Sequence, residues 1–416
     1  MLSEAVPLPA GGARAVARCV ALGRPPYSAM TDGLFRAWLT PAFRAAQESV
    51  ARWMREAGMA VSRDAATNLV GRYEGERGGP ALLIGSHLDS VRDGGFYDGP
   101  LGIMLGIECV GALHAAGRRL PFPIEVIAFG DEEGSRFPAA MLTSRAVAGT
   151  LGAPAPAMAD AEGVTLDAAL AGFGSSAAGL AMARHAPALA YLEAHIEQGP
   201  VLDADGLALG LVTGIAAQMR FRVTLSGRAG HAGTTSMALR RDALAAAAEM
   251  ILAAEAVAQD GPEDLVATVG AIDAAPGAPN VIPGHVVFSL DVRALDPAVR
   301  DQAANALIAR MHAIAASRSI AFTAELVHDL PASPCDPRLM TLLGHAMAHQ
   351  GHAPRRLASG AGHDAMILSA LCPMAMLFIR CRDGVSHHPA EHVEGTDAQA
   401  ALEVMLDFIH RLGDPA

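Results

Sequence analysis

Cysteine and aromatic residues are both scarce in this chain. The five cysteines (Cys19, Cys109, Cys335, Cys372 and Cys381) are odd in number and form no CxxC pair. This pattern argues against a disulfide framework and against a zinc site built on thiolates, and it indicates reduced thiols in a cytoplasm. Aromatic residues make up only 4% of the chain while apolar residues make up 51%, so we expect a sizeable aliphatic core.

Basic residues and long apolar runs are also lacking. Lys and Arg number 31 against 43 Asp and Glu, a net charge of -12, which argues against nucleic acid or an anionic membrane as a partner. No charge-free apolar run approaches the about 20 residues of a membrane-spanning helix. The N-terminal stretch MLSEAVPLPAGGARAVARCV has no apolar segment after a basic start, so no signal peptide is apparent. We therefore expect a cytoplasmic protein.

Strand-like and helix-like segments alternate in the first half of the chain. The runs PALLIGS, FPIEVIAF and LAYLEAHI are typical of strands, and GIMLGIECVGALHAAG is typical of a helix. Upstream, GLFRAWLTPAFRAAQESVARWMREAG predicts a helix with one proline interruption. The alternation predicts an α/β domain with a mostly parallel sheet.

The pattern changes near residue 213. Strand-like runs such as QMRFRVTLSG and GHVVFSLDVRAL, together with two helical segments, follow the β-α-β-β-α-β order of a ferredoxin-like unit. Asp296 and Pro297 are typical of the first positions of the second helix. We expect a catalytic domain in two parts, residues 1–212 and 331–416, with the ferredoxin-like domain inserted at residues 213–330.

Four polar clusters follow strand-like runs of the first domain, where open α/β sheets bind their ligands. The segment GSHLDS…GGFYDG holds His87 and Asp98, with Asp89 as a carboxylate that could orient the histidine. In GDEEGSRF, the neighbours Glu132 and Glu133 repel each other in a closed site unless a cation or a shared proton relieves the repulsion. The other clusters are EAHIEQGP, with His195, and DGVSHHPAEH.

Each cluster alone has a simpler interpretation. The first could be a glycine-rich turn, the second an exposed acidic loop, and His195 a structural histidine. Four clusters at strand ends of one domain are harder to explain by coincidence, and together they predict a metal site.

Six segments together resemble the signature blocks of the hydantoinase/carbamoylase amidase family. They are GSHLDSVRDGGFYDGPLG, DEEGSRFP, EAHIEQGPVL, GHAGTTSMALRRDA, SGAGHDAM and SHHPAEH, and they extend from about residue 84 to about residue 391. This family belongs to the wider group of two-zinc aminoacylases and peptidases. It contains N-carbamoyl-L-amino-acid hydrolases, β-ureidopropionases and allantoate amidohydrolases.

The resemblance implies two divalent metal ions bridged by one aspartate. Nitrogen and oxygen ligands without a thiolate suit zinc, and also manganese, cobalt or nickel. His388 stands where family members vary, so either it or His387 could ligate, and the flanking Ser386 and Pro389 favour His387. The implied ligands are His87, His195 and the bridging Asp98 for one metal, and Asp98, Glu133 and His387 for the other.

The resemblance also implies catalytic roles. Glu132 would be the general base, with Asp89 beside the metal ligands, and His231 of the inserted domain would stabilise the oxyanion. The site would then close when that domain moves. Arg293 offers a planar donor for a substrate carboxylate, although by itself it suggests a salt-bridged strand residue and Asn280 a turn former. The implied substrate-binding residues are Gln218, His231, Asn280, Arg293, Gly360 and Gly362.

The implied activity is hydrolysis of the C–N bond of an N-carbamoyl amino acid or related ureido acid, by a homodimer joined through the inserted domain. Carbamoyl-L-amino acids, carbamoyl-β-alanine and allantoate all remain open as substrates. The nearest rival is a peptidase or aminoacylase of the same group. A dinucleotide-binding oxidoreductase would need GxGxxG directly after a strand, and the glycine run near residue 94 carries His and Asp instead. A catalytically inactive binding protein would not need Glu132 and every ligand position intact.

Overall fold

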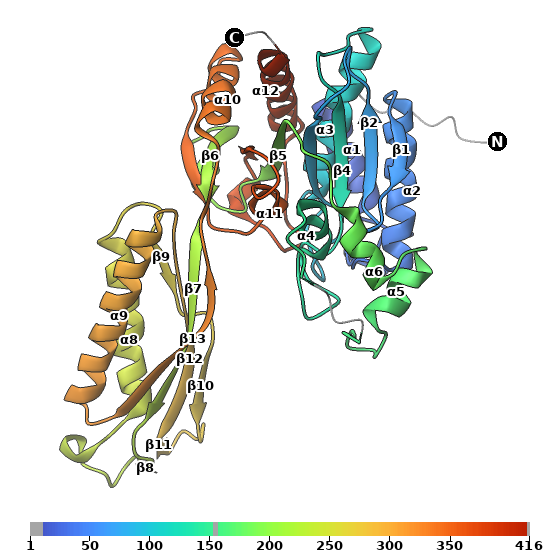
Figure 1. Cartoon of the computed structure of the whole chain (residues 1–416). Coiled ribbons are helices and arrows are strands. Elements are labelled where there is room, and N and C mark those ends of the chain that lie inside the picture. The colour runs from blue at the N-terminus through green and yellow to red at the C-terminus, as the bar shows by residue number, and fades with distance from the viewer. Residues whose placement is uncertain (1–10, 153–156, 414–416) are drawn as a thin grey trace. The chain divides into compact units, whose positions relative to one another are not determined.

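The structure, a computed structural model, describes residues 11–152 and 157–413. It divides into two compact units (Figure 1). Unit 1 comprises Met1–Thr213, Cys335–Leu357 and Gly362–Ala416, and unit 2 comprises Gly214–Pro334 and Ala358–Ala361. The sequence shows no apparent signal peptide in its N-terminal stretch. The first part of that stretch, residues 1–10, lies outside the described residues.

The strands of unit 1 form a mixed sheet in the order β1-β2-β4-β3-β5-β16-β6, with β15 also paired to β6. The four central strands β4, β3, β5 and β16 run parallel, whereas the outer pairs are antiparallel. The central strands are buried along their whole length, as expected where helices cover both faces of a sheet. This confirms the predicted α/β class. The strands are β1 (Ala60–Arg63), β2 (Leu69–Tyr73), β3 (Leu82–His87), β4 (Ile124–Phe129), β5 (Ala190–Ile196), β6 (Leu209–Ile215), β15 (Arg356–Ser359) and β16 (Met374–Ile379).

The helices of unit 1 bury apolar faces against this sheet and one another. Helix α3 is buried along most of its length and packs on β3, β4 and β5, and α11 packs on β3, β5, β16 and α4. No single described helix is long and apolar enough to cross a membrane, and one bent pair, Leu166–Gly172 with Ala177–Ala183, passes that test by length and composition. The helices are α1 (Gly12–Leu22), α2 (Pro41–Glu56), α3 (Pro100–Ala115), α4 (Leu142–Ala148), α5 (Leu166–Gly172), α6 (Ala177–Leu180), α7 (Val201–Ala204), α10 (Pro337–His349), α11 (Asp364–Leu368) and α12 (Gly395–Gly413).

One predicted helix begins later than expected. The segment from Gly33 to Leu39 is not helical, and α2 begins only at Pro41. Thr40 caps the helix by accepting a hydrogen bond from Phe43 N–H, and proline suits the first helical position because it has no N–H to leave unpaired. Upstream, the buried Arg36 guanidinium donates to the carbonyls of Leu22 and Leu88, contacts that hold this segment outside a helix.

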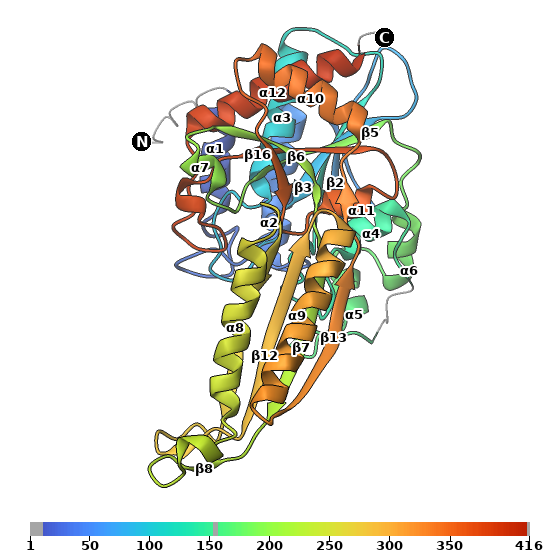
Figure 2. The ribbon, with the colours of Figure 1, turned by 90° about the vertical axis from the view of Figure 1, so that its left-hand side faces the viewer.

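Unit 2 is an antiparallel sheet covered by two helices that lie side by side (Figure 2). The sheet order is β10-β12-β7-β13, with β9 paired to β12, and β8 pairs separately with β11. Alternate residues of β12 are buried beneath the helices. Helix α9 begins at Pro297 after the N-cap Asp296, as predicted. The elements are β7 (Ala217–Ser226), β8 (Gly230–His231), α8 (Ala243–Gln259), β9 (Val266–Thr268), β10 (Ile272–Ala275), β11 (Val281–Ile282), β12 (His285–Ala294), α9 (Pro297–Ser317), β13 (Ala321–Leu330) and β14 (Ser333–Pro334).

Candidate metal centre

The ends of the parallel strands bring the polar clusters of unit 1 together. His87 is the last residue of β3, His195 is the sixth of the seven residues of β5, and the pair Glu132 and Glu133 follows β4. His387 follows β16, the neighbour of β5. Because parallel strands end at the same edge of a sheet, residues distant in sequence converge there.

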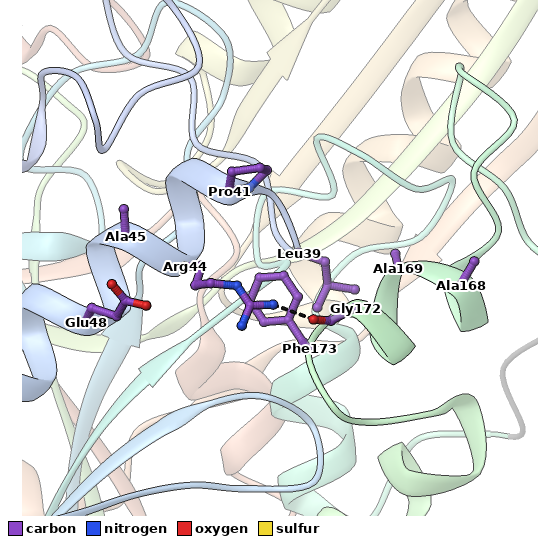
Figure 3. A pocket seen from close by; sticks show the side chains of 9 residues that line it. All are labelled: Leu39, Pro41, Arg44, Ala45, Glu48, Ala168, Ala169, Gly172 and Phe173. Carbon is purple, nitrogen blue, oxygen red and sulfur yellow. Dashed lines mark hydrogen bonds between the residues drawn. The ribbon is translucent and has the colours of Figure 1, made fainter.

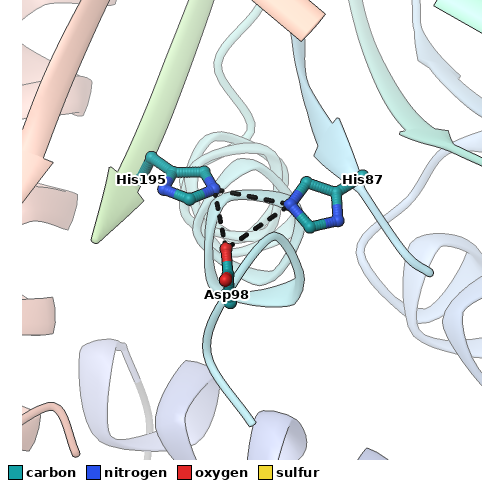
Figure 4. Close-up of side chains that lie close together, drawn as sticks. All are labelled: His87, Asp98 and His195. Atoms are coloured by element: carbon teal, nitrogen blue, oxygen red, sulfur yellow. Dashed lines mark hydrogen bonds and ion pairs between the residues drawn. The ribbon is translucent and has the colours of Figure 1, made fainter. Parts of the chain in front are cut away.

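His87 and His195 direct their Nε2 atoms toward each other and toward Asp98 (Figure 4). The two Nε2 atoms lie 3.5 Å apart, and Asp98 Oδ1 lies 3.5 Å from His87 Nε2 and 3.2 Å from His195 Nε2. The Nδ1 atoms face the backbone carbonyls of Asp89 (3.1 Å) and Ile196 (2.9 Å), respectively. A carbonyl accepts only from a protonated Nδ1, so each Nε2 keeps a lone pair for a cation.

The second carboxylate oxygen of Asp98 faces a different pair of side chains. Asp98 Oδ2 lies 3.1 Å from His387 Nε2, which lies 3.7 Å from Glu133 Oε2. The potential ligand atoms of each trio, His87/Asp98/His195 and Asp98/Glu133/His387, lie within 4.8 Å of one another. His388 is outside both trios and its Nδ1 accepts from the Ala390 N–H.

The electrostatics of both trios fit bound cations. Asp98 is buried and its Oδ1 accepts no well-aligned hydrogen bond. Burial disfavours its charged form, yet the neighbouring rings of His195, His387 and His87 hold the pKa of Asp98 well below the usual range. Burial raises the pKa of Glu133 to about 7. These nitrogen and oxygen donors match the preferences of zinc and related divalent ions, so the residues would fit one ion in each trio.

Glycines let the chain pass close to this centre. A Cβ on Gly99 would lie 2.4 Å from the His87 carbonyl oxygen and 2.6 Å from its ring, and the Gly99 φ of 83° also favours glycine. A Cβ on Gly95 would lie 2.1 Å from Glu391 Cδ. That space is needed because Glu391 Oε1 accepts from the N–H groups of Tyr97 (2.8 Å) and Asp98 (3.1 Å).

Glu132 lies beside the centre without joining either trio. Its Oε2 is 4.0 Å from His87 Nε2. Burial, together with the neighbouring carboxylates Glu133 and Asp364, raises the pKa of Glu132 well above its usual range. The Asp89 carboxylate accepts from the backbone N–H groups of Glu132 and Glu133, both at 3.2 Å. Asp89 therefore holds this acidic turn with its carboxylate, whereas its carbonyl orients His87.

Unit 2 carries the other predicted residues in two separate places. His231 on β8 is exposed, and its Nδ1 accepts from Gly233 N–H, which leaves the proton of the neutral ring on Nε2. The Ala232 N–H donates to the Asn280 carbonyl, and Val281 pairs with His231, so Asn280 is close to His231.

Gln218 and Arg293 face each other across β7 and β12. Arg293 makes a bidentate salt bridge with Asp291 and also donates to the Gly360 carbonyl. It is therefore a salt-bridged strand residue, as its sequence context alone suggested, and it also lies against the predicted glycine loop. Gly362 belongs to unit 1.

Comparison with known proteins identifies the family. The model of peptidase family M20/M25/M40 matches residues 83–411. The chain belongs to this family. N-carbamoyl-L-amino acid amidohydrolase of Geobacillus stearothermophilus is 43% identical over 92% of this chain and 94% of that protein. Allantoate deiminase 1 of Glycine max is 39% identical over 96% of this chain and 89% of that protein.

Solved structures agree with this membership of the M20/M25/M40 family. A hydantoinase/carbamoylase family amidase from Burkholderia ambifaria is 37% identical, with a TM-score of 0.89, over 98% of this chain and 99% of that chain. The resemblance drawn from the sequence blocks is thereby confirmed.

Two residues of the centre were not among the predicted set. Gln198 Nε2 donates to Asp98 Oδ2 at 3.0 Å and to Ser386 Oγ at 3.2 Å, and Glu391 supports Asp98 as described above. Gln198 follows the end of β5 in the same polar cluster as His195, a position that could have indicated it. For Glu391 the sequence offers only its place in the SHHPAEH block.

A separate surface pocket of about 420 Å³ lies between α2 and α5 (Figure 3). The Arg44 guanidinium lies 4.0 Å from the Phe173 ring centroid and donates to the Gly172 carbonyl (Figure 3). None of its lining residues belongs to the two trios. The lining residues are Leu39, Pro41, Arg44, Ala45, Glu48, Ala168, Ala169, Gly172 and Phe173.

Proposed function

We propose that this chain is a metal-dependent amidohydrolase that cleaves the C–N bond of an N-carbamoyl-L-amino acid or a related ureido acid. Cleavage of a carbamoyl amino acid consumes water and releases the amino acid, ammonia and carbon dioxide. The observation that carries this proposal is the orientation of Asp98, whose two oxygens face two different ligand trios beside Glu132. The relatives named as N-carbamoyl-L-amino acid amidohydrolases support this substrate class.

The two trios support the following roles for the metal ligands. His87, Asp98 and His195 would hold one ion, and Asp98, Glu133 and His387 the other, with zinc favoured and manganese, cobalt or nickel also compatible. Bound there, such ions polarise a substrate carbonyl and lower the pKa of a water molecule toward about 7.

The chain's own groups then handle the proton and the developing charge. The Glu132 carboxylate accepts a proton from the attacking water and returns it to the leaving nitrogen. The exposed Nε2–H of His231 is the donor that a developing oxyanion requires. Arg293 has five N–H groups, of which three are engaged with Asp291 and Gly360, and the others can bind a substrate carboxylate. Gln218, Asn280 and the loop at Gly360 and Gly362 complete the proposed substrate contacts.

The distance between the two groups of unit 2 supports a homodimer. Gln218 and Arg293 lie near one end of the β7–β12 pair, whereas Ser226 pairs with His285 at the other end, beyond which β8 begins. Eight residues of strand separate Gln218 from Ser226, a length of about 25 Å. One small ureido acid cannot reach both groups in the same chain, so we propose that His231 and Asn280 serve the partner's substrate.

The exposed edge strand β13 offers a surface through which unit 2 could pair with its copy. A cytoplasmic location is proposed on the free, buried state of all five cysteines.

An ammonia-release assay tests the activity. The metal-loaded protein would be offered N-carbamoyl-L-amino acids, N-carbamoyl-β-alanine and allantoate, with N-acetyl amino acids and dipeptides assayed in parallel for amino acid release. Turnover confined to ureido acids supports the proposal. Turnover confined to N-acyl amino acids or dipeptides would replace it with an aminoacylase or peptidase activity.

Allantoate is the second candidate substrate. The observation that favours it is the similarity to plant allantoate deiminases, which extends over 96% of this chain at 39% identity for both soybean proteins. The same assay decides between the candidates through the ratio of kcat/KM for allantoate to that for carbamoyl amino acids.

A further inference from the structure

A fully buried carboxylate lies directly behind the metal centre. Glu193 precedes His195 by two residues on β5, so both side chains lie on the same face of the strand. Its Oε1 accepts from Ser86 Oγ at 3.0 Å, and its Oε2 accepts from Tyr191 OH at 3.0 Å and from Ala365 N–H at 2.9 Å. All four residues are fully buried. Burying a carboxylate is costly, and among the described residues Glu193 is compensated by these three donors rather than by a salt bridge.

The three donors come from the segments that form the site. Ser86 immediately precedes the predicted ligand His87 on β3. Tyr191 lies on β5, the strand that carries His195. Ala365 is in the first turn of α11, directly after His363 and Asp364. One carboxylate therefore joins β3, β5 and the start of α11 within unit 1.

His363 extends this connection to the ligands. Its buried ring packs edge-on against His195, with centroids 4.4 Å apart. The ring is placed by the start of α11, whose Ala365 N–H is held by Glu193. A shift of α11 would therefore be transmitted to the ring of His195.

Glu193, His195 and His363 could be mistaken for a further metal site, because potential ligand atoms of all three lie within 4.8 Å of one another. Both ring nitrogens of His195 are already engaged, however. Nε2 faces Asp98 and Nδ1 faces the Ile196 carbonyl. His195 thus has no nitrogen lone pair directed toward Glu193 that could bind a further ion. The Glu193 carboxylate therefore holds neighbouring segments in place and does not act as a metal ligand.

We propose that Glu193 is a positioning residue of the metal centre, which fixes the ends of β3 and β5 and the first turn of α11 so that His87 and His195 present their Nε2 atoms to one ion. This role rests on the metal centre proposed above. Without the carboxylate, the Ala365 N–H and two hydroxyls lose their acceptor in the buried interior, and the segments must shift to find others.

Titration of metal into protein prepared without metal tests this role directly. Zn²⁺ or Co²⁺ would be titrated into the wild type, Glu193→Ala and Glu193→Gln, and the visible spectrum of the Co²⁺ forms recorded. We expect Glu193→Ala to bind metal about 10–100-fold more weakly, as when partners behind metal ligands are removed, and to alter the spectrum. Glu193→Gln should restore most of the affinity, because its amide oxygen can accept from Tyr191 and Ala365 while its NH2 donates to Ser86 Oγ.

Glu125 provides a matched control. It is also buried in the same sheet, on β4, forms hydrogen bonds with Arg72 and His185, and belongs to neither trio. Glu125→Ala should lower the melting temperature of metal-free protein without changing metal affinity or the Co²⁺ spectrum. This separates a loss of general stability from a loss of ligand placement.

Several outcomes would overturn the proposal. Wild-type metal affinity in a folded Glu193→Ala would do so, and so would a Glu193→Gln protein as impaired as Glu193→Ala. If Glu193→Ala does not fold, Ser86→Ala and Tyr191→Phe each remove one donor, and wild-type affinity in both variants overturns the role. A wild-type protein that binds no metal would instead refute the proposed function itself.

Discussion

His87 Nε2 and His195 Nε2 face each other at 3.5 Å, although 108 residues separate them in the chain. Each ring has its Nδ1 against a backbone carbonyl, at 3.1 Å for His87 and 2.9 Å for His195. Two lone pairs directed at each other and at a carboxylate repel unless a proton or a cation lies between them. This relationship makes metal binding the property to test first.

The first prediction concerns metal content. Protein purified with zinc or manganese should contain about two equivalents of metal, and a chelator should abolish activity that added metal restores. His387→Ala should lose roughly one equivalent and nearly all activity. Its neighbour gives the control, because His388 is outside both trios and His388→Ala should keep metal and turnover. Full activity in rigorously metal-free protein would contradict the proposal, and equal losses in the two histidine variants would contradict the ligand assignment.

The second prediction concerns Glu132, which lies beside the trios without joining them. Glu132→Gln should retain most of the metal and lose about 10²–10⁴-fold in kcat, the usual contribution of a general base. Glu133→Gln, one residue away, should instead lose metal because Glu133 belongs to a trio. Metal analysis and steady-state kinetics on both variants distinguish the roles. Near-normal turnover in Glu132→Gln would assign the base to another group.

The third prediction concerns pH and a partly buried pair, His185 and Glu125, neither of which belongs to the trios. His185 Nε2 lies 2.9 Å from Glu125 Oε2. The hydrogen bond to Glu125 raises the pKa of His185, and although burial opposes ionisation of Glu125, its bonds with His185 and Arg72 lower its pKa. A raised histidine pKa gives stability that is fully present below the unfolded value of about 6.5 and is lost as pH rises through the folded value. A lowered carboxyl pKa gives stability that is lost as pH falls through the folded value.

Melting temperatures of wild type and His185→Gln, compared across a pH series, test this pair. The wild type should exceed the variant most between about pH 5 and pH 6.5, and the difference should shrink toward pH 9. Comparing two proteins at each pH removes effects common to both, including those of the metal ligands. A difference that grows with pH would show that the His185 proton does not stabilise the fold.

Sequence patterns predicted the α/β class because buried parallel strands are continuous apolar runs, and clusters at their ends are visible as motifs. His87, Asp98, Glu133, His195 and His387 all come from such clusters. Glu391 could not be assigned a role in this way, because its hydrogen bonds to Tyr97 and Asp98 span more than 290 residues of sequence. The role of Glu193 could not be predicted from the sequence either, because the donors to its carboxylate come from three segments. The non-helical segment before Pro41 depends on long-range carbonyl contacts of Arg36, which no helical periodicity reveals.

The last prediction concerns which subunit of the proposed dimer supplies His231 to each active site. In one chain, the pair Gln218 and Arg293 lies about 25 Å along the strand from the end that leads to β8, so we expect His231 to complete the active site of the partner subunit. Glu132→Gln and His231→Ala should each be inactive as separate homodimers. Mixed under conditions that allow subunit exchange, they should regain about one quarter of wild-type activity, because half of the dimers are mixed and each mixed dimer has one intact site.

A second mixture controls for effects of exchange itself. Glu132→Gln combined with Glu133→Gln should gain nothing, because both lesions lie in unit 1 and every site of a mixed dimer keeps one of them. Exchange would be verified by native mass spectrometry with differently tagged chains. If mixed dimers form and the first mixture stays as inactive as its parents, His231 serves its own chain or takes no part in catalysis. Recovery in the first mixture alone assigns the oxyanion donor to the partner, because only an active site assembled from two chains can combine an intact Glu132 with an intact His231.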